Sequence, residues 1–118
     1  WQPQKLYYSG LAREQFERWR RIAEEAGIQS EWLQRRPDDE RPRGLPQERI
    51  TTCVDVTPYL ERKRAAFRCH RSQVRADHFM LTVSEDFARR AFYDECYIRA
   101  RSLVEAPTPE DDLFAGLR

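Results

Sequence analysis

The run "RPDDE", residues 36–40, is the first stretch whose residue types could do chemistry. Its carboxylates belong to the ligand types that zinc accepts in proteins. Arg36, which precedes them, is a permanent cation and cannot bind a metal. A zinc site also needs three or four ligands held by rigid elements, whereas this run lies among prolines. We therefore interpret residues 37–49 as a hydrated surface loop and predict no metal site there.

A second group with metal-binding residue types consists of Cys69, His70 and His78. Neighbouring residues on a helix project about 100° apart, so Cys69 and His70 would not face one another. The same geometry argues against a cysteine-histidine nucleophile pair. Among only four glycines we find no nucleophile elbow, no phosphate-binding loop and no dinucleotide-binding turn. We expect no catalytic residue and no metal ligand in this chain.

Three polar residues lie on or beside the apolar side of a helix that we predict over residues 58–74. Its apolar stripe is narrow and repeats every seven residues from Leu60, with Lys63 and His70 beside it and Gln73 at its edge. Polar side chains on an apolar face must find hydrogen-bond partners. They could form a satisfied structural network or line the edge of a polar pocket, and both interpretations stay open. Lys63, His70 and Gln73 are our candidate substrate-cleft residues.

The elements that must position these residues are few and mixed. Composition and alternation predict extended segments at residues 5–8, 50–56, 78–83 and 96–101. Apolar periodicity and caps predict helices over residues 11–26, ending at Gly27, over 58–74, and after Ser84, with a short helical turn after Ser30. The fold class is α/β with few short strands and two main helices, and we expect the strands to need partners beyond this chain.

Length and charge limit the functional classes. The chain has 118 residues, enough for one domain, and its 21 basic and 20 acidic residues give a net charge of +1. No overall field attracts nucleic acid or an anionic membrane, and no apolar run is long enough to span one, so we predict neither partner. Residues 58–75 are locally basic, however. The alternative hypothesis is a non-catalytic binding module that uses this basic helix for nucleic acid or a partner subunit.

The cysteines and the methionine give two further expectations. Cys53, Cys69 and Cys96 form neither an even set nor a CxxC pair, which indicates free packing thiols in a reducing, cytoplasmic setting. The chain starts at Trp1, and Met80 is its only methionine. We therefore expect that an N-terminal portion precedes these residues in a longer protein.

Four segments in order resemble the C-terminal part of the LmbE-like (PIG-L) zinc de-N-acetylases, and within that family the mycothiol S-conjugate amidases. They are "KLYY" followed by a helix, "ERITTCVDV", "YLERKRAAFRCHRSQV" and "PEDDLFAG". Each segment alone is weakly specific, but their order and spacing are more so, and the resemblance runs from Lys5 to Gly116. It implies that residues 1–118 are one C-terminal segment of a Rossmann-like enzyme, with a tail at 105–118.

The same resemblance implies an activity: zinc-dependent hydrolysis of the amide next to an amino sugar, on a small thiol-sugar conjugate. In such enzymes a His-Pro-Asp-Asp signature and a His-x-x-His motif bind the zinc in the N-terminal portion. This chain has neither, so the zinc would be bound by that missing catalytic portion, its main partner. The residues that transfer by motif are Lys63, His70, Ser72 and Gln73, expected to support the fold or the rim of the substrate cleft.

Overall fold

The computed structural model describes residues 1–34 and 42–118. The "RPDDE" run therefore lies outside the described residues. Part of the predicted loop 37–49 is described, and it contains a short 3₁₀ turn at Gln47–Arg49. Within the described ranges, no helix is long and apolar enough to cross a membrane.

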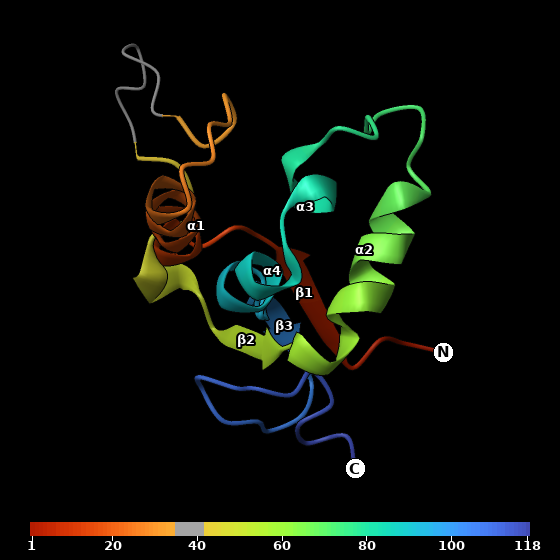
Figure 1. Cartoon of the computed structure of the whole chain (residues 1–118). Coiled ribbons are helices and arrows are strands. Elements are labelled where there is room, and N and C mark those ends of the chain that lie inside the picture. The colour runs from red at the N-terminus through yellow and green to blue at the C-terminus, as the bar shows by residue number, and fades with distance from the viewer. Residues whose placement is uncertain (35–41) are drawn as a thin grey trace.

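Three strands form one antiparallel sheet in the order β1-β3-β2 (Figure 1). They are β1 (Lys5–Ser9), β2 (Thr52–Asp55) and the longer β3 (Asp94–Ser102). These strands confirm the extended segments predicted near residues 5–8, 50–56 and 96–101. The expectation that they need outside partners was wrong, because β3 pairs with both of the others. The molecule is thus a small mixed α/β domain.

Helix α1 (Arg13–Glu25) follows the predicted periodicity. Its apolar side is buried, with Phe16 and Trp19 each less than a tenth exposed. The side chain of Gln15 accepts a hydrogen bond from the backbone N–H of Ala12 at 2.9 Å, which satisfies one donor at the helix start. The helix ends before Gly27, whose φ of 67° is the left-handed conformation that favours glycine.

Helix α2 (Leu60–Arg68) is shorter than predicted. The chain leaves the helix at Cys69 and continues in turns, in which the Gln73 N–H donates to the His70 carbonyl at 3.0 Å. A stripe of one apolar residue per seven buries too little surface to hold the two further turns that we predicted. The continuous basic helix over 58–75, on which the binding-module hypothesis depends, is therefore not formed.

The segment predicted to be extended at residues 78–83 instead contains helix α3 (Phe79–Thr82). A local cap and a side chain from α2 hold it. His78 Nδ1 accepts a hydrogen bond from the Met80 N–H at 3.3 Å. The Arg64 guanidinium on α2 donates to the carbonyls of Leu81 and Val83, at 3.0 and 2.9 Å. Tertiary contacts thus override the local preference for an extended chain.

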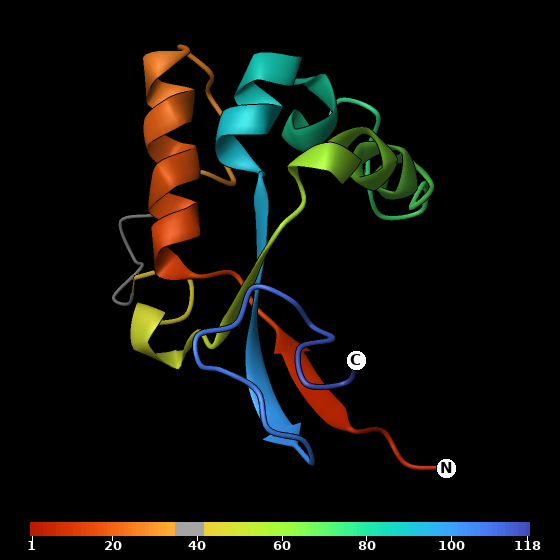
Figure 2. The ribbon, with the colours of Figure 1, turned by 90° about the horizontal axis from the view of Figure 1, so that it is seen from below.

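Helix α4 (Glu85–Ala91) begins where predicted, because the Ser84 hydroxyl accepts a hydrogen bond from the Phe87 N–H at 3.1 Å. Aromatic side chains join α4 to α1: the rings of Trp19 and Phe92 meet edge to face at 5.1 Å between centroids. The Trp19 indole N–H also donates to the Ala91 carbonyl. Figure 2 shows the helices gathered at one end of the sheet, with the C-terminal tail beside its other part.

The cysteines depart from the expectation of free packing thiols. Cys53 and Cys96 are directly opposite each other on β2 and β3, with Cα atoms 4.1 Å apart, and they form a disulfide. Cys69 is free but exposed rather than buried. The pairing depends on strand register between residues 43 positions apart, which spacing in the sequence does not indicate. The cysteines therefore no longer argue for a reducing compartment.

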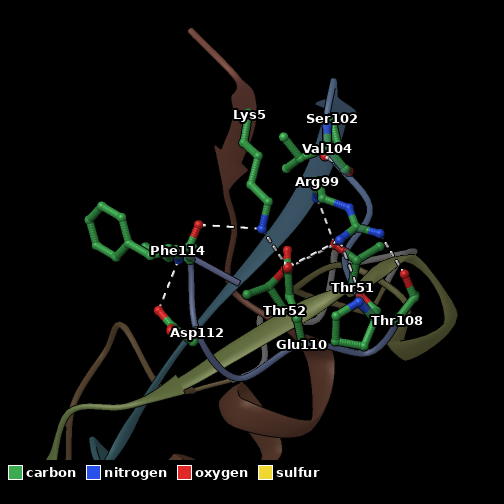
Figure 3. A network of polar contacts seen from close by, with 12 residues as sticks. Lys5, Thr51, Thr52, Arg99, Ser102, Val104, Thr108, Glu110, Asp112 and Phe114 are labelled. Carbon is green, nitrogen blue, oxygen red and sulfur yellow. Dashed lines mark hydrogen bonds and ion pairs between the residues drawn. The ribbon is translucent and has the colours of Figure 1, made fainter. Parts of the chain in front are cut away.

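A buried carboxylate attaches the tail to the sheet. The Glu110 side chain is fully buried, and Lys5, Thr52 and Arg99 point toward it in Figure 3. Lys5 Nζ lies 2.9 Å and Arg99 Nη1 3.1 Å from Glu110 Oε2. The hydroxyls of Tyr7 and Thr52 donate to Oε1 at 2.5 and 3.0 Å. Both oxygens of the carboxylate are therefore satisfied by donors from all three strands.

The backbone of Glu110 strengthens this attachment. Its N–H donates to the Thr51 carbonyl at 2.9 Å, and its carbonyl accepts from the Cys53 N–H at 3.1 Å. Residue 110 thus pairs with the free edge of β2. Burial acts to raise the pKa of Glu110, but hydrogen bonds from Lys5, Tyr7 and Thr52 and the charge of Arg99 lower it to about 2.

We expect Glu110→Ala to lower the free energy of unfolding by about 3–5 kcal/mol, because it leaves the buried ammonium of Lys5 without its counter-ion. Urea unfolding followed by circular dichroism measures the change. Asp111→Ala removes the neighbouring, exposed acid and should change stability by less than about 0.5 kcal/mol. Equal effects of the two substitutions would show that the buried cluster does not stabilise the fold.

The contribution of Glu110 to stability should also depend on pH. The pKa of Glu110 is depressed from 4.5 to about 2 in the folded chain, so its stabilisation is complete above about pH 4.5 and is lost as the pH falls through 2. Thermal unfolding midpoints between pH 2 and 6 should therefore drop more steeply for the wild-type chain than for Glu110→Gln. Parallel profiles would contradict the assignment of the acid-sensitive step to Glu110.

Candidate functional site

An ion pair between α2 and β3 is the centre of the candidate site. Lys63 Nζ lies 3.0 Å from Glu95 Oε1, and both side chains are partly exposed. The hydroxyl of Tyr97, two residues further along β3, donates to Glu95 Oε2 at 2.7 Å. Alternation along the strand places Glu95 and Tyr97 on the same face, which is why the two can meet.

The protonation states of this group follow from its contacts. Burial acts to raise the pKa of Glu95, but hydrogen bonds from Tyr97 and Lys63 outweigh it, and the pKa is lowered. Burial, followed by the hydrogen bond to Glu95 and its charge, raises the pKa of Tyr97 to about 12. At neutral pH Glu95 is therefore a carboxylate and Tyr97 a neutral donor. The group is suited to binding polar ligands rather than to moving protons.

An apolar hollow of about 250 Å³ lies on one side of the ion pair. Its floor combines the buried Leu60 and Phe92 with the half-buried Phe67 and Met80. The residues that line it are Leu60, Lys63, Arg64, Ala66, Phe67, His70, Met80, Phe92 and Glu95. They come from α2, the turn after it, α3, the residue that follows α4, and the start of β3. Helices α2, α3 and α4 lie side by side in Figure 1.

A more polar hollow of about 230 Å³ lies on the other side of the same ion pair. Its lining residues are Ser9, Gly10, Leu11, Gln15, Trp19, Lys63, Asp94, Glu95, Cys96 and Tyr97. Part of this wall is already satisfied, since the Gln15 amide donates to Asp94 Oδ1 at 3.0 Å and Arg18 pairs with the same carboxylate. Lys63 and Glu95 are shared by both hollows.

The structure brings together two of the three candidate residues. Lys63 and His70 both line the apolar hollow. His70 follows the end of α2, where its Nδ1 lies 3.1 Å from the Ala66 carbonyl and its ring is 6.3 Å from that of Phe67. Gln73 is exposed in the next turn and does not line the hollow. His70 lies two residues beyond the end of α2 and stays beside Lys63, whereas Gln73 lies five residues beyond that end and turns away from the hollow.

Sequence reasoning missed Glu95 and Tyr97. Both lie just outside or at the start of the segment 96–101 that we predicted as a strand, and nothing nearby in the sequence points to Lys63 as their partner. A signal was present in the alternation of polar residues at positions 95, 97 and 99, which places them on one side of β3.

The described residues do not fit a zinc site. Across 1–34 and 42–118, no three His, Cys, Asp or Glu side chains gather that could hold a metal ion. Cys69, His70 and His78 in particular form no such group: Cys69 Sγ lies 3.4 Å from the Ala65 carbonyl, and the rings of His70 and His78 pack against that of Phe67 at 6.3 and 5.1 Å between centroids. We therefore derive no metal-assisted step from these residues.

The coupling of Tyr97 to Glu95 can be measured directly. We expect Glu95→Gln to lower the pKa of Tyr97 from about 12 part of the way toward 10, because the charge is removed while burial remains. Carbon-13 NMR of labelled tyrosines, titrated from pH 8 to 13, resolves this change. Glu48→Gln, on an exposed residue that lines neither hollow, is the control and should leave the Tyr97 titration unaltered.

Sequence comparison relates the chain to curated deacetylases and an amidase. It is 33% identical over 115 residues to the 1D-myo-inositol 2-acetamido-2-deoxy-alpha-D-glucopyranoside deacetylase of Acidothermus cellulolyticus, covering 96% of this chain and 39% of that protein. It is 32% identical over 122 residues to the mycothiol S-conjugate amidase of Streptomyces coelicolor, covering 100% and 40%. A deacetylase of the first kind from Frankia alni is 30% identical over 132 residues, covering 99% and 42%.

No family model matches the chain, and no solved structure matches it. The chain spans about two-fifths of the length of the curated relatives above. The similarity nevertheless extends over nearly all of its own residues and includes both kinds of enzyme. The resemblance predicted from the sequence is thus confirmed, and the chain is a homologue of the 1D-myo-inositol 2-acetamido-2-deoxy-alpha-D-glucopyranoside deacetylases and of mycothiol S-conjugate amidase.

Proposed function

We propose that this chain forms the C-terminal part of a zinc-dependent hydrolase that cleaves the amide of an N-acyl glucosaminyl-inositol. The enzyme would be a mycothiol S-conjugate amidase or a related de-N-acetylase, with residues 1–118 as a C-terminal segment of its Rossmann-like fold. The observation that carries this proposal is the similarity of nearly the whole chain to two-fifths of such enzymes. The remaining catalytic portion would supply the residues that bind zinc and activate water.

The part assigned to this chain is to bind and orient the substrate. Lys63 keeps N–H donors beyond the one directed at Glu95, and the Glu95 carboxylate keeps lone pairs beyond those used by Lys63 and Tyr97. Such a pair can hold the hydroxyl groups of a sugar or an inositol ring. Orientation by fixed polar groups is a substantial part of catalysis even where the reacting atoms lie elsewhere.

A chimaera tests the proposal. Residues 1–118 replace the corresponding region of the Streptomyces coelicolor mycothiol S-conjugate amidase, and the purified chimaera is assayed for bound zinc and for hydrolysis of both relatives' substrates. We expect a zinc-loaded enzyme that hydrolyses at least one of them. A folded, zinc-loaded chimaera that hydrolyses neither would contradict the proposal.

Variants of the chimaera test the role of the ion pair. Lys63→Met should raise KM about three- to tenfold, as expected for the loss of one or two hydrogen bonds to the substrate, and should leave zinc content unchanged. Arg62→Met removes a neighbouring, exposed cation that lines neither hollow, and is the matched control. A KM unchanged by Lys63→Met would remove this residue from the substrate cleft.

A further inference from the structure

The disulfide between Cys53 and Cys96 closes a loop that carries the apolar hollow. Every residue that lines this hollow, from Leu60 to Glu95, lies between the two cysteines in the sequence. The same loop contains α2, α3 and α4, whereas β1, α1 and the tail lie outside it. One covalent bond thus encloses the walls of the hollow and leaves the rest of the fold unlinked.

The non-covalent attachment of β2 and α2 to β3 rests on short elements. Strand β2 has four residues and leads through the 3₁₀ turn Thr57–Tyr59 directly into α2, so the two can leave β3 together (Figure 1). Helix α2 has nine residues, a length that is marginal in isolation, and Leu60 is its buried residue. Its ion pair to β3, Lys63 with Glu95, is partly exposed and is therefore a weak restraint.

The disulfide opposes separation of β2 from β3 in a way that hydrogen bonds do not. Hydrogen bonds break and form again within the folded protein, whereas the covalent link restricts the chain even after the strands separate. A cross-link between residues 43 positions apart lowers an opening equilibrium by about a hundredfold to a thousandfold through chain entropy. Cleavage of this bond therefore makes opening of β2 and α2 more frequent by the same factor.

The two sulfur atoms differ in their access to solvent. Cys96 is 5% exposed, whereas Cys53 on the edge strand is half-buried. A small thiol therefore reaches Cys53 Sγ first. Asp94 Oδ2 lies 4.0 Å from Cys96 Sγ, so the thiol that Cys96 becomes on reduction has an acceptor beside it. The buried sulfur is thus accommodated in the reduced protein as well.

We propose that the Cys53–Cys96 bond is a redox-sensitive link that holds β2 and α2 against β3 when oxidised and allows them to open, with the walls of the hollow, when reduced. A low-molecular-weight thiol, as its thiolate, attacks Cys53 Sγ and forms a mixed disulfide, while the bond to Cys96 breaks and Cys96 leaves as a thiolate that takes up a proton. A second thiol attacks the mixed disulfide, forms a disulfide with the first and releases Cys53 as a thiol. Two thiols are oxidised to one disulfide, and the protein gains two electrons and two protons. This link does not require the proposed hydrolase activity.

Hydrogen–deuterium exchange of the 118-residue chain, oxidised and then reduced with dithiothreitol, tests the proposal. The amides of Cys53 and Val56, which bond to the carbonyls of Glu110 and Tyr93, and those of α2 should exchange about a hundredfold faster after reduction. Those of α1, outside the loop, should change less than about threefold, and reoxidation should restore the first pattern.

Three results would overturn the proposal. Unchanged exchange in β2 and α2 would show that their non-covalent contacts suffice. Equal acceleration in α1 would show that the bond stabilises the whole fold and does not act on one part of it. A bond that resists dithiothreitol in the folded chain would be a permanent cross-link.

Serine variants provide the matched control. Cys69→Ser removes the exposed free thiol, keeps the disulfide and should behave as the wild-type chain does in both redox states. The triple variant with serine at 53, 69 and 96 should exchange like the reduced chain and should not respond to dithiothreitol. Protection in the triple variant equal to that of oxidised Cys69→Ser would contradict the proposal. If the triple variant does not fold, reversible reduction of Cys69→Ser decides alone.

Discussion

The buried carboxylate of Glu110 is the interaction on which the arrangement of the sheet depends. A charge in a dry environment is tolerated only where several donors surround it, and here the donors come from Lys5 on β1, Thr52 on β2 and Arg99 on β3. Satisfying one anion therefore requires all three strands to be in register. Apolar side chains among the helices can tolerate small displacements of their neighbours, but a buried ion cannot tolerate the loss of its donors. The Glu110 cluster therefore specifies how the three strands and the tail are arranged.

Strand β3 carries that constraint to the candidate site. One face of the strand presents Glu95, Tyr97 and Arg99 at alternate positions. Arg99 is fixed by the tail, through Glu110 and through a hydrogen bond to the Thr108 hydroxyl at 2.6 Å. Glu95, four residues before Arg99 on the same strand, forms the ion pair with Lys63. The tail and the two hollows are thus linked by a single rigid strand, although no tail residue lines either hollow.

Elements governed by local chemistry were predictable from the sequence. The buried residues of α1 recur at helical spacing within one segment, and Gly27 follows its end. The start of α4 is indicated by Ser84, which caps it. Helix α3 was not predictable, because its carbonyls are satisfied by Arg64 from another element. The length of α2 was overestimated because Val74 continues the seven-residue stripe, whereas the helix ends at Arg68 with Leu60 as its buried residue.

The same distinction applies to the site and to the covalent link. Lys63 and His70 could be paired from their seven-residue spacing, because His70 lies only two residues beyond the end of α2. Glu95 and Tyr97 required knowledge of which strand faces α2. The disulfide required the register of β2 on β3. Periodicity reports which side of an element a residue occupies, but it says nothing about the element on the opposite side.

The pairing of β1 with β3 has a consequence for how the chain acquires its structure. Lys5 and Glu110 are 105 residues apart, and the strand that lies beside β1 begins at Asp94. During synthesis β1 therefore emerges long before any residue it pairs with, and the entropy of closing so large a loop must be overcome before its contacts form. Until then β1 is an unprotected strand with exposed aromatic side chains, the type of segment that associates with other chains. Efficient folding of this piece thus depends on keeping β1 unassociated until β3 has been made.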